Sequence, residues 1–570
     1  MTTTLLSKTV AQRIAEALRR HGVKIIFGQS LPSAVILAAE AIGIKQVAYR
    51  QENMGGAMAD GYARRSGRVG IVTAQNGPAA TLLVAPLAEA LKASIPVIAL
   101  VQDVERNQAD KNAFQELDHI ALFQPCTKWV RRVIVPERID DYIDAAFTAA
   151  ISGRPGPAAL LLPADLLRDT APEPAMGRTS DLGSWPIDRT RPSDADVRSA
   201  ANLIASARAP VVLAGGGVHC ADASEALAAL QEAASLPVLT TNMGKGAVDE
   251  THPLSAGVLG SLVGPGSLGR HTAALLSEAD LVVLVGTRTN QNGTDNWRQI
   301  STNSKVIHID VDPVEIGRNY ESVRLLGDAR ETVNALREML LDQDLSVRHN
   351  ARASVTVRIA EYWRLFEMDR KTVYTSASSP IRPERVMAEL QKCLPASATV
   401  VADASYSSMW IVGQIRARRG LRFLAPRGLA GLGWGLPLAL GAKAAKPEDA
   451  VVVVVGDGGF AHSWAELETM MRMQLPVTII VLNNGILGFQ RDAETVKFGK
   501  FTSACHFNDV DHARIADACG CPAVRIHKPD DLAAELRQAL LGKEARLIEV
   551  MTDPGAHPPL SLFSEMDRLA

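Results

Sequence analysis

The chain has 570 residues, of which 47% are hydrophobic and 21% are charged, and its formal net charge is −2. This length exceeds what one core can organise and predicts three or four domains, while the near-neutral charge gives no electrostatic case for binding nucleic acid or an anionic membrane. No apolar run reaches the roughly 18 residues of a transmembrane helix, and the basic, amphipathic N-terminus is not typical of a signal peptide. With six scattered cysteines, the composition predicts a cytoplasmic protein whose thiols are reduced.

Residues 1–185 are predicted to form one α/β domain, because short buried strands alternate with helices. Glu52 follows one of these strands. The next residues, 53–65, are predicted to form a helix rich in small residues that can pack closely against another element. A second strand ends in the turn Gln75-Asn76-Gly77-Pro78. The strands that we expect in this domain are 24–27, 46–50, 69–74, 96–101 and 158–162.

Residues 170–192 are rich in proline, glycine and polar side chains and are predicted to be a linker. They lead to a second domain, 193–345, with expected strands at 211–213, 281–285 and 306–310. Gly216, Arg288 and Asp310 lie at the ends of these strands, where a nucleotide commonly binds in such folds. A glycine-rich turn lets a backbone approach phosphates and an aspartate can hold a ribose, but a full G-x-G-x-x-G pattern is missing. A nucleotide site and an empty cleft both stay open.

Residues 346–379 are predicted to be a polar, partly helical crossing segment, and residues 380–560 a third domain. Its most informative stretch is 451–490, which predicts a buried strand to Val455, a glycine turn, a helix over 461–473, and a second strand ending in Asn483-Asn484. In a β-α-β unit, both strand ends lie at the same edge of the sheet, so Asp457 and Asn484 are expected to meet there.

The residues at this edge have the chemistry of a metal and diphosphate site. The Asp457 carboxylate, the Asn484 amide oxygen and the backbone carbonyl of Ile486 are hard oxygen ligands that suit Mg²⁺. The turn residues allow backbone N–H groups to approach a diphosphate; they are Gly456, Gly458 and Gly459. The first domain repeats this plan, as Ile95-Pro96-Val97 and Leu475-Pro476-Val477 begin comparable strands.

With Glu52, the turn at 75–78 and the 456–484 motif located, the whole chain resembles the acetohydroxyacid (acetolactate) synthase-like family of thiamine-diphosphate (ThDP) enzymes. The resemblance implies an α/β fold with three doubly wound parallel-sheet domains: pyrimidine-binding, 1–185; central, 193–345; and diphosphate-binding, 380–560. It also implies ThDP and Mg²⁺ as cofactors. In this family the cofactor lies between the first domain of one subunit and the third domain of another, so a homodimer or homotetramer is expected.

The resemblance also assigns cofactor-binding residues. The segment Arg50 to Ala57 matches the family's segment around its catalytic glutamate, which makes Glu52 the carboxyl that shares a proton with N1′ of the aminopyrimidine. Leu432, in Gly431 to Pro437, stands where relatives place a bulky apolar residue that brings the two cofactor rings together. Tyr406 and Ser407 stand where relatives have polar diphosphate ligands.

The substrate pocket is assigned from the same resemblance. Gln115, in Ala113-Phe114-Gln115-Glu116, is expected to hydrogen-bond a reacting carbonyl, and Phe114 to line the pocket. Ser30 stands near a substrate-facing polar position of the relatives. Leu487 and Phe489 belong to the loop after the Asn pair, which lacks the tryptophan that synthases have there.

The resemblance implies an enzyme that decarboxylates a 2-keto acid, or cleaves a C–C bond, and transfers the acyl group to a second carbonyl. A lyase, decarboxylase or hydrolase without carboligation is the alternative, because the loop after Asn484 departs from the synthase pattern. The central domain has Thr289-Asn290-Gln291 where flavin-binding synthases show an aromatic and two acids, so FAD or another nucleotide stays open there. A flavin or nicotinamide oxidoreductase and a non-catalytic scaffold are the more distant alternatives.

Overall fold

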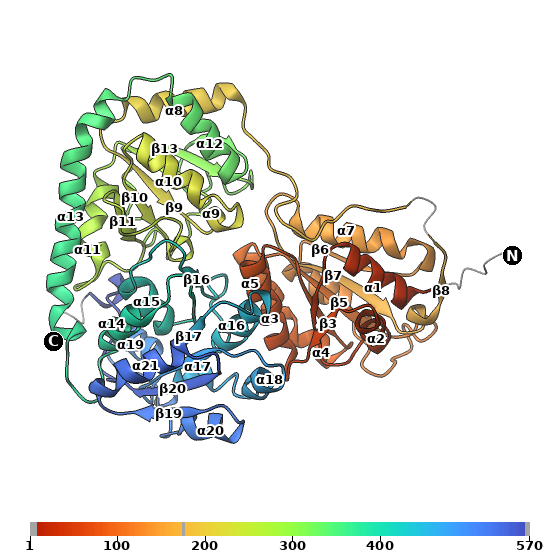
Figure 1. Cartoon of the computed structure of the whole chain (residues 1–570). Coiled ribbons are helices and arrows are strands. Elements are labelled where there is room, and N and C mark those ends of the chain that lie inside the picture. Colours follow the sequence, from red (N-terminus) through yellow and green to blue (C-terminus); the bar gives the residue numbers. More distant parts are fainter. Residues whose placement is uncertain (1–7, 174–176, 565–570) are drawn as a thin grey trace.

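The computed structural model describes residues 8–173 and 177–564 and contains three six-stranded parallel sheets, one in each predicted domain range (Figure 1). Helices cover the sheets, so the predicted α/β class with three doubly wound domains is confirmed. A short antiparallel pair, β1 (Lys8–Thr9) and β8 (Thr170–Ala171), returns the start of the predicted linker to the N-terminus of the first domain.

The first domain has the strand order β3-β2-β4-β5-β7-β6. Its residues alternate between two cores: α1, α2 and α7 cover one face of the sheet, and α3 and α5 the other. In sheet order the strands are Lys45–Val47, Ile25–Phe27, Gly70–Ala74, Val97–Asp103, Ala158–Pro163 and Trp129–Arg132. The helices α1 to α7 are Val10–Arg20, Ser33–Ala41, Glu52–Ser66, Pro78–Leu82, Val84–Ala93, His119–Phe123 and Ile139–Ile151.

The central domain has a different order, β11-β10-β9-β12-β13-β14, which is that of dinucleotide-binding folds. Its strands in that order are Ser255–Val258, Val238–Thr240, Pro210–Ala214, Leu281–Val285, Lys305–Asp310 and Val323–Leu326. Helices α8 to α12 are Asp194–Ser206, Gly217–Cys220, Ser224–Ala233, Leu268–Ser277 and Ala329–Leu340. The predicted crossing segment is mostly one long helix, α13 (Ser346–Tyr374), which runs along the outside of the molecule to the third domain (Figure 1).

The third domain repeats the strand order of the first, as β16-β15-β17-β18-β20-β19. These strands are Arg422–Leu424, Thr399–Ala402, Val451–Gly456, Thr478–Asn483, Arg546–Met551 and Ala523–Ile526. Helices α14 to α21 are Pro383–Cys393, Tyr406–Gln414, Gly435–Ala445, Asp457–Phe460, Glu466–Arg472, Gly488–Phe498, His512–Ala518 and Leu532–Leu541.

The first and third domains of the chain share one hydrophobic core, in which α3 packs against α16. Two glycines make this packing close: a Cβ at Gly61 would lie 2.2 Å from the carbonyl oxygen of Leu438, and one at Gly441 would lie 2.0 Å from that of Met58. The predicted close packing of the small-residue helix is therefore confirmed, and its partner lies in the other cofactor domain.

The predicted helix over 461–473 is wrong in its first part. The chain forms α17 directly after the strand, passes through turns at 461–465, and resumes as α18 at Glu466. Ser463 N donates a hydrogen bond to Phe460 O, and Glu466 N donates one to Ser463 O. These bonds join residues three positions apart, so the chain is wound more tightly here than in an α-helix. The predicted strand 46–50 also ends early, at Val47.

Two predictions from composition concern disulfide bonds and membrane-spanning helices. In the structure all six cysteines are free. Across residues 8–173 and 177–564, we find no helix that combines the length and apolar character needed to cross a membrane.

Candidate active site

A pocket lies at the carboxyl ends of β15, β17 and β18 in the third domain. These strands are neighbours in a parallel sheet, so their ends deliver side chains to one edge. The predicted site residues that line the pocket are Tyr406, Ser407, Leu432, Gly456, Asp457, Gly458, Gly459, Asn484, Ile486 and Leu487.

Asp457 and the Asn484 loop are joined at the centre of this pocket. The Asp457 carboxylate is buried, and its Oδ2 accepts a hydrogen bond from Gly485 N at 2.9 Å. Asn484 Oδ1 accepts from Ile486 N at 3.2 Å, which turns the loop back on itself. Burial raises the pKa of Asp457 to about 6. A carboxylate and an amide oxygen thus share one pocket, which Ile486 also lines, and oxygen donors of this kind suit Mg²⁺.

Tyr406 and Ser407 begin α15 beside the glycine turn. The Tyr406 hydroxyl donates to Asp492 Oδ2 at 2.5 Å, and its ring packs against Phe489 and Phe563. Tyr406 therefore lines the pocket with its ring, and the predicted donation from its hydroxyl to a diphosphate would require the bond to Asp492 to break. Ser407 Oγ lies 3.7 Å from the position that a Cβ would take at Gly456, next to the glycine turn.

The loop that carries Leu432 is fastened to the pocket by Asp403, for which sequence reasoning predicted no role. The fully buried Asp403 carboxylate accepts from Gly433 N and Gly435 N, both at 3.0 Å. A Cβ at Gly459 would lie 2.1 Å from Asp403 Oδ2, so the glycine turn must pass close to this carboxylate. Leu432 itself is 37% exposed and lines the pocket.

The other predicted residues lie at the corresponding edge of the first sheet. Ser30 follows β2, Glu52 follows β3 as the first residue of α3, and Gln115 lies over the turn after β4. Strands β3, β2 and β4 are adjacent and parallel, so their carboxyl ends share one edge.

Gln115 is held by the turn predicted at 75–78. Gln75 Nε2 donates to Gln115 Oε1 at 2.8 Å, and Asn76 Nδ2 donates to the carbonyl oxygens of Phe114 and Gln115. Because the Gln115 oxygen accepts from Gln75, the Gln115 amide can offer its N–H groups to a substrate carbonyl. Phe114 is 84% exposed beside it.

A buried histidine supports this turn from below and was not found from the sequence. His119 Nε2 accepts from Gly77 N at 3.0 Å, so its Nδ1 carries the proton and donates to Asp103 Oδ1 at 3.2 Å. Asp103 in turn accepts from Arg132 Nε at 2.7 Å.

Within one chain the two sets of residues form two separate half-sites. We define the diphosphate half-site as the pocket around Asp457 and Asn484, and the glutamate half-site as Ser30, Glu52, Phe114 and Gln115. None of these four glutamate half-site residues lines the third-domain pocket. Phe489 also stands outside its lining, against Tyr406, while Leu487 belongs to it.

Comparison with known proteins identifies the family. Residues 8–122, 197–336 and 403–550 match, respectively, the N-terminal TPP binding domain, the central domain and the C-terminal TPP binding domain of thiamine pyrophosphate enzymes. The chain belongs to the thiamine pyrophosphate enzymes. Thiamine pyrophosphate is ThDP under another name, so this is a ThDP-dependent enzyme.

Its relatives identify the branch of the family. A probable acetolactate synthase large subunit of Methanocaldococcus jannaschii is 34% identical over 96% of this chain and 93% of its own length. An acetolactate synthase of Arthrospira platensis is 34% identical over 95% and 94%, and the isozyme 3 large subunit of Escherichia coli is 31% identical over 93% and 92%. This ThDP enzyme is therefore acetolactate synthase-like, as the sequence predicted.

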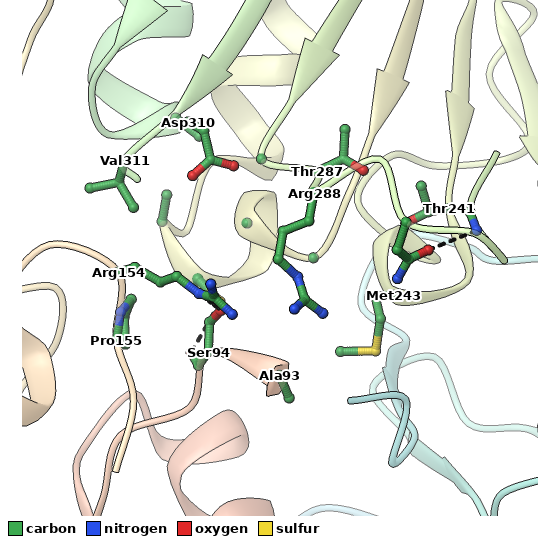
Figure 2. A pocket seen from close by; sticks show the side chains of 18 of the residues that line it. Ala93, Ser94, Arg154, Pro155, Thr241, Met243, Thr287, Arg288, Asp310 and Val311 are labelled. Carbon is green, nitrogen blue, oxygen red and sulfur yellow. Dashed lines mark hydrogen bonds between the residues drawn. The ribbon is translucent and has the colours of Figure 1, made fainter. Parts of the chain in front are cut away.

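The ThDP enzyme also has a cavity of about 140 Å³ where the central domain faces the other two (Figure 2). Gly216, Arg288 and Asp310, the predicted nucleotide residues, all line it. Figure 2 shows Arg288 extending into the cavity, with Arg154 and Ser94 opposite. Burial lowers the pKa of Arg288 and raises that of Asp310 to about 6.

The three glycines at the mouth of this cavity have different roles. A Cβ at Gly215 would lie 2.4 Å from Gly286 O, and one at Gly217 would lie 2.6 Å from Gly286 Cα. These two glycines therefore allow the ends of β9 and β12 to approach each other. Gly216 faces Met243 instead, because a Cβ added there would lie 3.2 Å from the Met243 Cβ, and its backbone stays at the cavity.

Proposed function

We propose that this enzyme decarboxylates a 2-keto acid, or cleaves an equivalent C–C bond, and transfers the acyl group to a second carbonyl with the help of ThDP and Mg²⁺. The observation that carries the proposal is that the two half-sites present different chemical groups. One presents oxygen donors and backbone N–H groups, and the other presents a carboxyl and an amide that can face a carbonyl compound. The near full-length similarity to acetolactate synthases supports the same reaction.

The diphosphate half-site fits ThDP and Mg²⁺. Its donor set consists of Asp457, Asn484 and the Ile486 carbonyl, and these are the oxygen types that Mg²⁺ prefers. Gly456 to Gly459 would bring backbone N–H groups to a diphosphate, whose charge the metal offsets. When bound, ThDP supplies a thiazolium carbon that adds to carbonyl groups and accepts the electrons of the broken bond.

The chain's own residues would orient the reactants and handle protons. The Glu52 carboxyl would hold a proton at N1′ of the aminopyrimidine, and Leu432 would support the cofactor from below. Gln115 would donate an amide N–H to the substrate carbonyl, since Gln75 holds its oxygen. Phe114, Leu487 and Phe489 would exclude water, which favours transfer to a second carbonyl over protonation by solvent.

We propose that two chains complete each site, as a homodimer or a homotetramer. Both half-sites are rimmed by apolar side chains that are exposed in the single chain. These are Leu82, Phe114 and Leu117 at the glutamate half-site, and Leu429, Leu432, Phe489, Phe501 and Phe507 near the diphosphate half-site. Exposed apolar patches of this kind mark interfaces. Pairing the half-sites of two copies around a two-fold axis would bury both rims and form two equivalent sites.

A C–C lyase or hydrolase without carboligation is the second candidate. It is favoured by the loop Gly485 to Arg491, which has Leu487 and Phe489 but no tryptophan at the place where the second substrate binds in synthases. Such an enzyme would release CO₂ and an aldehyde, or two fragments of an acyloin, in place of a ligated product.

The test is an assay of purified protein with ThDP, Mg²⁺ and pyruvate, followed by a panel of other 2-keto acids and acyloins. CO₂ release with a ligated hydroxy-keto acid would support the synthase reaction. Cleavage products alone would favour the lyase or hydrolase, and no ThDP-dependent product from any member of the panel would contradict both. Gln115→Ala is expected to raise the KM of the keto acid and lower kcat about tenfold.

We further propose a nucleotide, FAD or another, in the central cavity. Arg288 makes no side-chain hydrogen bond or ion pair within the part of the chain that the structure describes, so its cation can meet phosphates. Asp310 can accept from ribose hydroxyls. Mass spectrometry and absorbance of the purified protein would identify the nucleotide, and Arg288→Ala should release it. Protein that is free of nucleotide and takes up none on addition would contradict this proposal.

A further inference from the structure

A buried glutamate from the third domain holds the chain directly before Glu52. Glu466, the first residue of α18, is fully buried. Its Oε1 accepts from Arg50 N at 3.0 Å and from Gln51 N at 3.1 Å. Its Oε2 accepts from the Thr469 hydroxyl at 2.7 Å and, at the longer distance of 3.3 Å, from Arg50 N. Because these two backbone N–H groups bond to Glu466, they do not extend the sheet, in agreement with the end of β3 at Val47.

A buried glutamate from the first domain does the same for the loop before Leu432. Glu89, in α5, accepts from Gly428 N at 2.6 Å through Oε1. Its Oε2 accepts from Leu429 N at 2.5 Å and from Ala430 N at 3.2 Å. Ala430 has a φ of +63°, a conformation that a residue with a Cβ adopts only when its surroundings enforce it.

We infer that Glu466 and Glu89 are positioning residues that form a reciprocal clamp, in which each cofactor domain fixes the cofactor loop of the other. Glu466 fixes the entry of α3 and with it Glu52; Glu89 fixes the loop that carries Leu432. The inference rests on the proposed roles of Glu52 and Leu432. Because those two residues belong to different half-sites of one chain, the clamp joins two active sites of the proposed dimer.

The physical reason for such a clamp is the cost of burying a carboxylate. A buried carboxylate is stable only when its lone pairs are satisfied, and most of the acceptor capacity of both residues is used by backbone N–H groups of the other domain. Arg64 Nη2 lies 3.7 Å from Glu89 Oε1 and adds a cation to that end of the clamp. A shift of either loop would leave a carboxylate and two or three N–H groups without partners, so the loops are restricted to one position.

The geometry predicts different outcomes for glutamine at the two positions. In Glu466→Gln, the amide oxygen can still accept from Arg50 and Gln51, and the amide nitrogen can donate to the Thr469 hydroxyl. Only the longer contact of Arg50 N, at 3.3 Å, is lost. Turnover should stay within about threefold of the wild type. In Glu89→Gln, three N–H groups converge on both oxygens, so the amide nitrogen must face at least one of them. Its kcat should fall about tenfold.

Removal of the Glu466 side chain gives the larger effect. Glu466→Ala should lower kcat about 100-fold through misplacement of Glu52, while Mg²⁺-dependent ThDP affinity changes by less than about threefold. Glu361→Gln is the control, because this glutamate lies on the outer helix α13, is exposed and pairs with its neighbour Arg364. It should leave kcat unchanged.

Amide hydrogen exchange of the full-length wild type and variants reports on the clamp without requiring turnover. The amides of residues 50–51 should exchange at least about tenfold faster in Glu466→Ala than in the wild type, and those of 428–430 faster in Glu89→Gln. Unchanged exchange in these variants would overturn the clamp even if the enzyme turns over keto acids. Conversely, absence of turnover in the wild type with faster exchange in the variants would contradict the proposed function and leave the clamp standing.

A final comparison separates positioning from charge. If Glu466→Gln loses as much kcat as Glu466→Ala, the carboxylate acts through its charge or its proton, and the inference is wrong. If Glu466→Ala does not fold, the two glutamine variants, which keep the side-chain volume, decide the question. A loss of kcat in Glu466→Gln as large as that in Glu89→Gln would contradict the inference.

Discussion

The first and third domains have the same strand order, but they carry different side chains at the edges of their sheets. Both sheets place their strands in the same relative order, and each sends a helix with a close-packing glycine, α3 or α16, to the other. What differs is the sequence after corresponding strands: β4 ends in Gln75-Asn76-Gly77-Pro78, whereas β17 ends in Gly456-Asp457-Gly458-Gly459. The first turn positions Gln115, and the second presents a carboxylate and backbone N–H groups.

In both domains the sheet places its strand ends at one edge, and we propose that the turns at that edge carry the function. A parallel sheet brings strand ends together whatever their sequence, so a duplicated plan can carry cofactor binding in one copy and proton handling in the other. The central domain, with its different strand order, has a cationic cavity at the same kind of edge. Four experiments test this comparison. The first two test the division of roles, the third tests the contact between the two domains, and the fourth tests the central cavity.

Glu52→Gln should have the largest effect, because it removes the only proposed proton-holding group of the glutamate half-site. We expect kcat to fall about 1,000-fold with ThDP still bound, as for the loss of a general acid or base. Steady-state kinetics and calorimetric ThDP titration measure the two quantities. Unchanged turnover would refute the assignment of Glu52.

Asp457→Ala should show the opposite split between binding and turnover. The Asp457 carboxylate, which accepts a hydrogen bond from Gly485 N, is a proposed metal ligand. Because the variant lacks this ligand, Mg²⁺-dependent ThDP affinity should fall about 100-fold. Titration with ThDP at several Mg²⁺ concentrations tests this. If affinity stays at the wild-type level while kcat falls, the two half-sites do not divide their labour as we describe.

Gly441→Ala tests the contact that joins the two domains. The added Cβ would lie 2.0 Å from Met58 O, a backbone atom, so α16 and α3 must separate. We expect the free energy of unfolding to fall by about 2–3 kcal/mol, as for overpacked cores. Gly177→Ala is the matched control, since open space surrounds it. Equal denaturation midpoints for the two variants would exclude a tight α3–α16 contact.

The smallest expected effect is a pH dependence of nucleotide affinity in the central cavity. Burial raises the pKa of Asp310 to about 6, so the group is mostly ionised at a pH of about 7.5 and mostly protonated at about 5. If the ionised carboxylate accepts from a ribose, nucleotide affinity should fall about tenfold as the pH decreases through about 6. The Asp310→Asn variant should bind more weakly at the higher pH and show no such decrease. An identical pH profile for both would remove Asp310 from the site.

The sequence predicted the α/β class, most strands and the two site motifs because buried parallel strands and glycine turns leave local signals. The β-branched run at 451–455 and the turn at 456–459 are readable without any distant contact. Asp457 and Asn484 were accordingly expected at one edge, and the structure places both in one pocket.

The residues that sequence reasoning missed depend on distant partners. Glu89 and Glu466 look like ordinary helical glutamates, and their role appears only when backbone N–H groups from more than 300 positions away reach them. His119 likewise shows its role only through its contacts, with Gly77 N 42 positions away. A charged residue on the apolar face of a short helix was the one available signal, since such a residue is seldom buried without partners. The break at 461–465 depends likewise on tertiary packing, including the bond from Trp464 Nε1 to His512.

The central claim, that each active site combines a glutamate half-site and a diphosphate half-site from two chains, has a direct measurement. Inactive Glu52→Gln and Asp457→Ala chains are mixed under conditions that exchange subunits, and ThDP-dependent turnover is followed. Mixed dimers would contain one site with both wild-type residues, so activity should return to about a quarter of the wild-type value. A mixture as inactive as its components, with subunit exchange verified, would contradict the claim.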